Sequence, residues 1–392
     1  MIREYNLLSP EIVQNPYAVY AEMRKTAPVA FVKPPGFYAV SRYDDVVRVL
    51  KTPAVFSNSA YAQFDEGEVE GGATADAGIL AADPPRHTQM RGIILKAFTP
   101  RVVAQLEPRI REISAELVDS IKNEREFDLV ESVTIPLPMI VIAELLGIGA
   151  ERRRDFKRWS EDMISTASMT GESPSERVKT SVMEFNEFIH KTLSEREKEP
   201  RGDILSGLLA AELEGSKLSM LEVLSFASTL LIAGNETTTA LIGNTLIALT
   251  DNPDQYEAVR SDPSLIPGLI EEVLRYQSPV QNIIRKAKED AVIGGETIPK
   301  DAVLMLMLGA ANHDENRFPD PEKFDMRRDT KGHLAFGFDI HFCLGAALAR
   351  LEAKAILEVL LPGLPQLKRK EKDVTWVRSL LARSPQQLVL TA

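Results

Sequence analysis

The sequence predicts a mainly α-helical protein with a minor β part, built as a single domain over residues 1–392. Apolar residues recur at three- and four-residue spacing, which is typical of amphipathic helices, in the segments near 101–123, 151–170, 175–198, 219–250 and 344–361. Stretches with the character of strands are short and occur at 28–32, 37–40 and 291–305, where Gly294-Gly295 marks a turn. No linker divides the 392 residues, and this length suits one large domain.

Composition and charge exclude several classes of function. The 46 Lys and Arg against 57 Asp and Glu give a net charge of −11, which argues against nucleic acid as a partner. A single cysteine excludes an internal disulfide framework and a cysteine-rich zinc site, and the five histidines show no metal-ligand spacing. The first ten residues contain no apolar signal core, and no apolar run is long enough to span a membrane. We therefore expect a cytoplasmic protein with no membrane partner.

The segment 57–85 is rich in Gly, Ala and acidic residues, lacks helical periodicity and contains Gly71-Gly72 and Pro84-Pro85. It is longer than an ordinary connection between elements. Two interpretations are open: a functional lid, or a mobile solvated loop.

The helix predicted over 219–250 is the best defined. Ser219 and Glu222 fit a capping box, and Asp251-Asn252-Pro253 supplies a stop. About 32 residues make a helix of roughly 48 Å, long enough to cross the domain. Its middle reads AGNETTT over 233–239, a poor choice for a buried helix, so the break with the local rule suggests a functional site. The alternative is structural, with threonine hydroxyls bonded to the preceding turn and Glu236 in an ion pair.

Cys343 directly precedes the strongly helical segment that follows it. A helix N-terminus favours a thiolate, which is a soft-metal ligand or a nucleophile. A lone cysteine is more often an inert buried side chain. The nucleophilic interpretation is the weaker one, because His341 is only two residues away and no residue suggests itself to orient it.

Five segments share the order of a known set of motifs: 83–91 (DPPRHTQMR), 233–238 (AGNETT), 272–275 (EVLR), 321–327 (PEKFDMR) and 336–345 (FGFDIHFCLG). Together they resemble the motifs of the cytochrome P450 superfamily, in its soluble bacterial form. The resemblance covers essentially the whole chain. It implies the cytochrome P450 fold, with haem b held between the long central helix and the Cys-loop helix, and with Cys343 as the axial ligand of the iron.

The resemblance also implies which residues contact the haem propionates: His87, Arg91, Arg285 and His341. His87 and Arg91 are four apart and share one face of a helix. Carboxylates shielded from water require cationic partners or strong donors. Surface ion pairing is the alternative for each residue taken alone.

Two further groups follow from the resemblance. Glu272 and Arg275 would join the meander arginine, Arg327, in a buried network that holds the Cys loop. Glu236 and Thr237 would form the acid–alcohol pair that supplies protons for O₂ activation. The small Ala233-Gly234 step before them would leave room for O₂.

The substrate pocket implied by the resemblance lies between the central helix and the 57–85 loop. Its lining residues would be Phe64, Thr229, Ala233, Val280, Gln281, Ile283 and Leu380. Most are apolar, so we expect a hydrophobic small organic substrate. Plain core packing is the alternative for each of these side chains.

The chain contains no flavin or dinucleotide fingerprint. Electrons would therefore come from a separate ferredoxin or flavodoxin with its reductase. Basic residues in the segments that would flank the Cys-loop face could dock such a donor, or form an ordinary solvated surface: Lys96, Arg101, Arg350 and Lys354.

Most of all, the motifs favour an O₂-dependent monooxygenase that hydroxylates or epoxidises its substrate. The alternatives are a peroxide-driven haem peroxygenase and a non-catalytic hydrophobic-ligand or haem-sensor protein. The Glu236-Thr237 pair favours the first. One departure from the family is Asp339 in place of the usual Gly, where we expect a left-handed backbone at a cost of roughly 1 kcal/mol.

Overall fold

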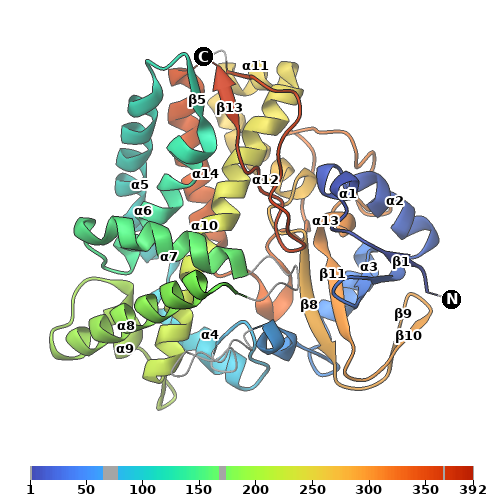
Figure 1. The fold of residues 1–392 in the computed structure, drawn as a ribbon, viewed down its shortest axis with the longest axis horizontal. Helices are drawn as coiled ribbons and strands as arrows, with labels where there is room; N and C mark the ends of the chain where they lie inside the picture. The colour runs from blue at the N-terminus through green and yellow to red at the C-terminus, as the bar shows by residue number, and fades with distance from the viewer. Residues whose placement is uncertain (1, 65–77, 167–173, 365–366, 392) are drawn as a thin grey trace.

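The computed structural model describes residues 2–64, 78–166, 174–364 and 367–391. Figure 1 shows two parts: most helices lie together on one side, and the larger sheet with the N-terminal helices lies on the other. The sequence-based prediction of a mainly α-helical protein with a minor β part is confirmed. No helix within the described ranges is long and apolar enough to cross a membrane.

All five helical segments predicted from periodicity are present, as α5, α7, α8, α10 and α14. The α-helices are α1 (Pro10–Gln14), α2 (Tyr17–Thr26), α3 (Tyr43–Leu50), α4 (Arg86–Ala97), α5 (Pro100–Ile121), α6 (Pro136–Leu145), α7 (Arg153–Thr166), α8 (Glu176–Lys198), α9 (Ile204–Ala210), α10 (Met220–Asp251), α11 (Pro253–Ser261), α12 (Ile266–Tyr276), α13 (Leu308–Ala311) and α14 (Ala346–Gly363). The shorter helical turns are η1 (Asn58–Phe64), η3 (Val130–Thr134), η4 (Ala150–Arg152), η5 (Pro263–Leu265) and η6 (Asp339–His341).

The strands are β1 (Glu4–Tyr5), β2 (Val29–Val32), β3 (Phe37–Val40), β4 (Phe56–Ser57), β5 (Glu126–Asp128), β6 (Glu212–Leu213), β7 (Ser216–Lys217), β8 (Asn282–Ala287), β9 (Ala291–Ile293), β10 (Glu296–Ile298), β11 (Val303–Met307), β12 (Lys368–Arg369) and β13 (Val389–Thr391). Six of them form one sheet in the order β1-β2-β3-β11-β8-β4. In it β8 runs antiparallel to β11, with Arg285 opposite Leu304. This pairing fixes Arg285 on a buried strand rather than on a mobile surface segment.

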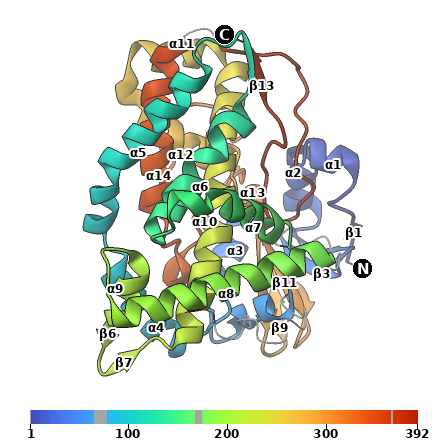
Figure 2. The same cartoon turned by 60° about the vertical axis from the view of Figure 1, so that its left-hand side comes forward.

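Helix α10 is the central element of the helical part. The predicted capping box is present, because Ser219 Oγ accepts from the Glu222 amide while the Glu222 carboxylate accepts from the Ser219 amide. The helix packs against α6, α8, α12 and α14, and Figure 2 shows α8 crossing it. Burial on all sides agrees with its largely apolar sequence.

The segment predicted to be irregular, 57–85, contains regular structure at its start. It begins within β4 and continues into η1, whereas residues 65–77 lie outside the described part of the chain. Asn58 joins the two ends, because its amide donates to Asp83 Oδ1 (3.0 Å) and its side chain to the Leu80 carbonyl (2.8 Å). The prediction of a lid or a mobile loop falls largely on residues 65–77, outside the described residues.

Candidate active site

The loop before α14 carries Cys343, whose side chain is exposed. Its two arms close where the Cys343 amide donates to the Phe336 carbonyl at 2.9 Å. Gly337 (φ 73°) and Asp339 (φ 58°) both take the left-handed conformation that turns the chain back. The expectation for Asp339 is therefore confirmed, since Asp is one of the few residues besides Gly that tolerate this geometry.

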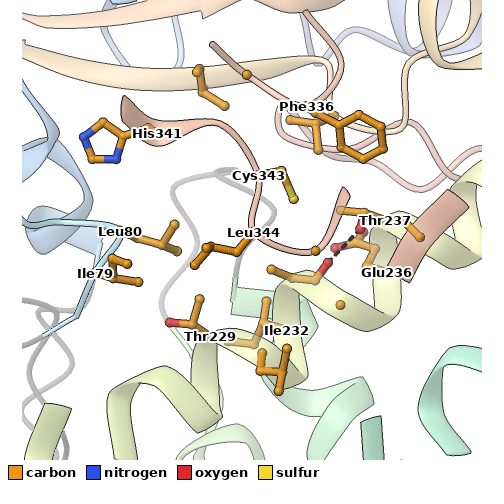
Figure 3. A pocket seen from close by; sticks show the side chains of 18 of the residues that line it. Ile79, Leu80, Thr229, Ile232, Glu236, Thr237, Phe336, His341, Cys343 and Leu344 are labelled. Atoms are coloured by element: carbon orange, nitrogen blue, oxygen red, sulfur yellow. Dashed lines mark hydrogen bonds between the residues drawn. The ribbon is translucent and has the colours of Figure 1, made fainter. Parts of the chain in front are cut away.

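Cys343 borders a cavity of about 540 Å³, within the size range of ligand sites. In the view of Figure 3, the cysteine lies between His341 on one side and Glu236 and Thr237 on the other. Burial raises the pKa of the Cys343 thiol, although the amides of the α14 N-terminus and Arg91 and Arg350 act in the opposite direction. The predicted helix-end stabilisation of a thiolate is present, but burial outweighs it.

The nucleophilic interpretation of Cys343 gains no support from its surroundings. Nδ1 of His341 lies 3.1 Å from Nδ2 of Asn58 rather than bonding to the sulfur. A nucleophile requires a base within hydrogen-bond reach, and none is paired with the sulfur among the described residues.

His87 on α4 and His341 of the Cys loop form one polar end of the cavity. Their ring centroids lie 3.9 Å apart. Nδ1 of His87 and Nε2 of His341 are buried without a hydrogen-bond partner in the described structure. Burial lowers the pKa of His87 to about 4 and that of His341 to about 3, so both rings are neutral at pH 7. Each ring still has an N–H to donate, and the two unpartnered nitrogens lie at a cavity wall.

Arg91 and Arg285 line the same cavity and leave their charges unpaired. Nη2 of Arg91 donates to the Phe342 carbonyl at 2.7 Å, and Nη1 of Arg285 to the Ile284 carbonyl at 2.7 Å. Neither makes an ion pair within the described ranges, so the surface ion-pair alternative does not hold for them. Burial lowers the pKa of both guanidinium groups, as expected for cations that are removed from water without an anionic partner.

The residues around this cavity fit haem. Two cationic side chains, of which Arg285 is buried, and two unpartnered imidazole nitrogens line one end, as required to bind two carboxylates. The thiol of Cys343 borders the same space, as required for an axial ligand. The orphaned nitrogens carry this conclusion, because buried polar atoms are normally satisfied.

Glu236 and Thr237 lie on the α10 side of the cavity. The Thr237 hydroxyl donates to the Ala233 carbonyl at 2.7 Å. This bond to the preceding turn is the one expected if the threonines have a structural role. The ion pair of that alternative is not found: Glu236 has no salt bridge with any described residue. Burial raises the pKa of Glu236 to about 7. The carboxyl is thus poised to exchange protons near neutral pH.

Both small residues before this pair line the cavity, Ala233 and Gly234. Gly234 also packs against α6, since a Cβ built on it would lie 2.8 Å from Cδ1 of Ile142. The close contact with α6 gives Gly234 a packing role that the sequence motif does not reveal.

The buried network is present, with one correction. Arg275 binds the Glu272 carboxylate through Nε and Nη2, both at 2.8 Å, and both residues are fully buried. The third member is Arg328, whose Nε lies 3.3 Å from Glu272 Oε1, and not Arg327, which is exposed. The Asp325 amide also donates to Glu272, and a turn joins the Arg328 amide to the Asp325 carbonyl. This turn places residue 328, rather than 327, toward the carboxylate.

The predicted pocket residues divide into three groups. Thr229, Ala233, Val280 and Ile283 line the cavity. Gln281 and Leu380 do not line it, so these two assignments are wrong: both side chains are buried away from it, and Leu381 lies on its wall instead. Backbone in an extended conformation turns successive side chains to opposite sides, which separates Gln281 from Val280. The side chain of Phe64 lies outside the described part.

Several lining residues escaped the sequence-based prediction: Ile79, Leu80, Met163, Val182, Phe226 and Ile232. They come from four separate elements and carry no local signal that differs from core. Only the three-dimensional arrangement distinguishes them (Figure 3 shows Ile79, Leu80 and Ile232).

Two of the basic residues predicted to flank the Cys-loop face have carboxylate partners. Arg350 binds Glu271 and Lys354 binds Glu358. Lys96 donates to the Glu212 carbonyl, and Arg101 is exposed. This surface is therefore less available to a partner than the sequence suggests.

Comparison with known proteins agrees with this geometry. The family model described as Cytochrome P450 matches residues 6–364. The solved structure of cytochrome P450 CYP109Q5 from Chondromyces apiculatus is 51% identical with a TM-score of 0.93, covering 100% of this chain and 99% of that one. CYP109E1 from Bacillus megaterium, solved in complex with testosterone, is 35% identical with a TM-score of 0.85, covering 96% and 99%. The 6-deoxyerythronolide B hydroxylase of Saccharopolyspora erythraea is 37% identical over 384 residues, 94% of this chain and 93% of that protein.

Proposed function

Because the chain belongs to the cytochrome P450 family, we propose that it is a haem-thiolate monooxygenase acting on a neutral hydrophobic molecule. It would insert one oxygen atom from O₂ into a C–H bond or a double bond of the substrate. The observation that carries this proposal is the arrangement around one cavity: the Cys343 thiol, the unpaired propionate-type donors, and the buried acid Glu236.

The cofactor is proposed to be haem b, held without a covalent link to its edge. Cys343 would bind the iron, while His87, His341, Arg91 and Arg285 would bind the propionates. When bound, the haem supplies the electron-transfer and O₂ chemistry, which thiolate ligation directs toward O–O cleavage. Without haem, burial opposes ionisation of the Cys343 thiol. Binding to the iron would therefore be what favours the deprotonated form of the thiol.

The residues of α10 would handle protons. With a pKa of about 7, Glu236 both gains and loses a proton near neutral pH, as a relay requires. The Thr237 hydroxyl uses its hydrogen on the Ala233 carbonyl, which leaves its oxygen lone pairs free to accept a hydrogen bond from a water at the cavity wall. Glu236 would then pass protons to such a water at its carboxyl oxygens.

The charges of the cavity favour a neutral substrate. The cationic side chains among its described lining residues are Arg91 and Arg285, both assigned to the propionates. The segments 65–77 and 167–173 contain no Lys or Arg. The remaining walls are mainly apolar, and the hydroxyl of Thr229 at the wall has no hydrogen-bond partner among the described residues. A carboxylate buried here would therefore lack a counter-charge, whereas the neutral steroid in the related CYP109E1 complex illustrates a substrate of the expected kind.

Electrons are proposed to come from a separate ferredoxin or flavodoxin with its reductase. The sequence lacks the glycine fingerprints that bind flavin or nicotinamide cofactors.

The test uses the purified, haem-loaded protein. We expect its reduced carbonyl complex to show the red-shifted Soret band of thiolate ligation, and Cys343→Ser to lose it. A neutral steroid should shift the spin state of the iron more strongly than a long-chain fatty acid, and should be oxidised with O₂ and a reduced ferredoxin system. A colourless protein that takes up no haemin would refute the assignment. Product formed from peroxide alone, equally well in Glu236→Gln, would favour a peroxygenase. A spin-state shift without consumption of the ligand would favour a sensor.

A further inference from the structure

Glu271 precedes Glu272 on α12, but its carboxylate binds a different set of residues. Oε1 of Glu271 lies 2.6 Å from Nε of Arg350, and Oε2 lies 3.0 Å from Nη2 of Arg350. Oε2 also lies 3.0 Å from Nε2 of His333. Burial alone would raise the pKa of Glu271, but the bonds from His333 and Arg350 outweigh it and lower the pKa to about 2. We call Glu271, His333 and Arg350 the Glu271 cluster.

The Glu271 cluster contacts the Cys loop from two sides. The guanidinium carbon of Arg350 lies 4.4 Å from the ring centroid of Phe336, a cation–π geometry. On the other side, Nδ1 of His333 accepts from the Ala335 amide at 3.2 Å. Phe336 is the residue whose carbonyl accepts from the Cys343 amide. The cluster therefore holds the backbone that fixes the cysteine.

Arg350 also places a positive charge beside the Cys loop. Its guanidinium lies over Phe336, the residue whose carbonyl accepts from the Cys343 amide. The carboxylate of Glu271 opposes that charge, because the two groups form a bidentate pair. The net field at the sulfur therefore depends on both members.

We propose that Glu271 and Arg350 are positioning residues that set the reduction potential of the iron bound to Cys343. This inference rests on the proposed haem-thiolate function. Reduction adds one negative charge to the iron–sulfur unit, so a cation nearby stabilises the reduced form and an anion destabilises it. Charge and hydrogen bonding around an axial ligand are established means of tuning such sites.

The proposal differs from the docking role considered for Arg350 on sequence grounds. A docking residue would alter the salt dependence of electron transfer from the donor. It would leave the equilibrium potential of the isolated protein unchanged. Measuring the potential without any donor present therefore separates the two roles.

The experiment compares the full-length haem-loaded protein with Glu271→Gln, Arg350→Gln and the double variant, by spectroelectrochemical titration. Glu271→Gln removes the negative charge and should raise the midpoint potential. Arg350→Gln removes the positive charge and should lower it, and the double variant should return toward the parent. The matched control is Lys354→Gln, one turn further along α14, whose partner is Glu358. It should leave the potential unchanged.

Shifts of opposite sign are the result that a merely structural role would not produce. Shifts of the same sign, or shifts no larger than that of Lys354→Gln, would overturn the proposal. If Arg350→Gln does not retain haem, the test rests on Glu271→Gln, which keeps Arg350. If the midpoint potential of Glu271→Gln does not rise, the proposal is overturned. A parent protein without the thiolate Soret signature would instead count against the proposed function itself.

Discussion

Nε of Arg328 lies 3.3 Å from Oε1 of Glu272, the oxygen that also accepts from Nη2 of Arg275 at 2.8 Å. One fully buried carboxylate thus satisfies two guanidinium groups from different segments. Arg275 also donates to the Asn312 and Pro321 carbonyls. The network joins α12 to the segment that leads into the Cys loop. Removing one of its members should therefore lower the free energy of unfolding.

We expect Arg328→Ala to lower the free energy of unfolding by about 3 kcal/mol, because it breaks a largely buried ion pair. Arg327→Ala is the matched control, since Arg327 is exposed and surface substitutions usually stay within about 0.5 kcal/mol. Denaturant titrations of the two variants provide the measurement. Equal effects of both substitutions would contradict the assignment of Arg328.

His87→Leu should weaken haem retention. The imidazole has an unpartnered nitrogen at the cavity, and a hydrogen bond to a charged group contributes about 1.5–3 kcal/mol. This corresponds to a loss of haem about tenfold faster or more. Transfer of haem to an excess of a scavenger protein measures the rate. His190→Leu, an exposed position on α8, should release haem at the parent rate.

Glu236→Gln should change the pH dependence of turnover. A relay acid with a pKa of about 7 is increasingly deprotonated above that pH, so the parent rate should fall as pH rises through 7. The variant has no titrating carboxyl, so its lower rate should lack this limb. Rates measured with a saturating donor from about one pH unit below to about one pH unit above this pKa test the prediction. Persistence of the limb in Glu236→Gln would assign it to another group.

The same carboxyl should affect stability with a defined sign. In the unfolded chain it ionises near its usual value of 4.5, whereas the folded protein keeps it protonated up to about 7. The folded state therefore holds the extra proton, and stability falls as pH rises from 4.5 to 7, by up to about 3 kcal/mol. Relative to the parent, Glu236→Gln should gain stability across this window. Unfolding of the apoprotein at the two pH values measures it, with the exposed Glu257→Gln as a control.

Gly234→Ala should destabilise the protein by about 1–3 kcal/mol through overpacking, although Ala is favoured over Gly in a helix by about 1 kcal/mol. The added Cβ would lie 2.8 Å from Cδ1 of Ile142. Ile142→Val removes that methyl group, so combining the two substitutions should recover most of the loss. Thermal unfolding of both single variants and the double variant measures the coupling. A fully stable Gly234→Ala would show that α6 moves aside freely.

Local pattern was sufficient for the helices and for the chemistry-bearing motifs. The capping box of α10 and the left-handed Asp339 both depend on bonds or dihedrals within a few residues. Such features are short-range, so the sequence carries them directly. The resemblance of five ordered segments to one family was likewise found from the sequence without a structure, and the family comparison agrees with it.

The errors share a different origin. The sequence placed Arg327 in the network, and Gln281 and Leu380 on the pocket wall, each beside a neighbour that fills the role. Whether residue n or n+1 faces a given group depends on the turn or extended backbone that leads to it.

The sequence by itself indicated the cytochrome P450 family, and with it the cysteine, the acid and the basic residues that we propose as the site of a haem-thiolate enzyme. The tertiary structure alone decided which arginine completes the network, that Gly234 packs against Ile142, and that Glu271 and Arg350 meet beside Phe336. These are contacts between segments far apart along the chain. They depend on how α6, α10, α12 and α14 pack, and packing is a property of many side chains together that no local motif encodes.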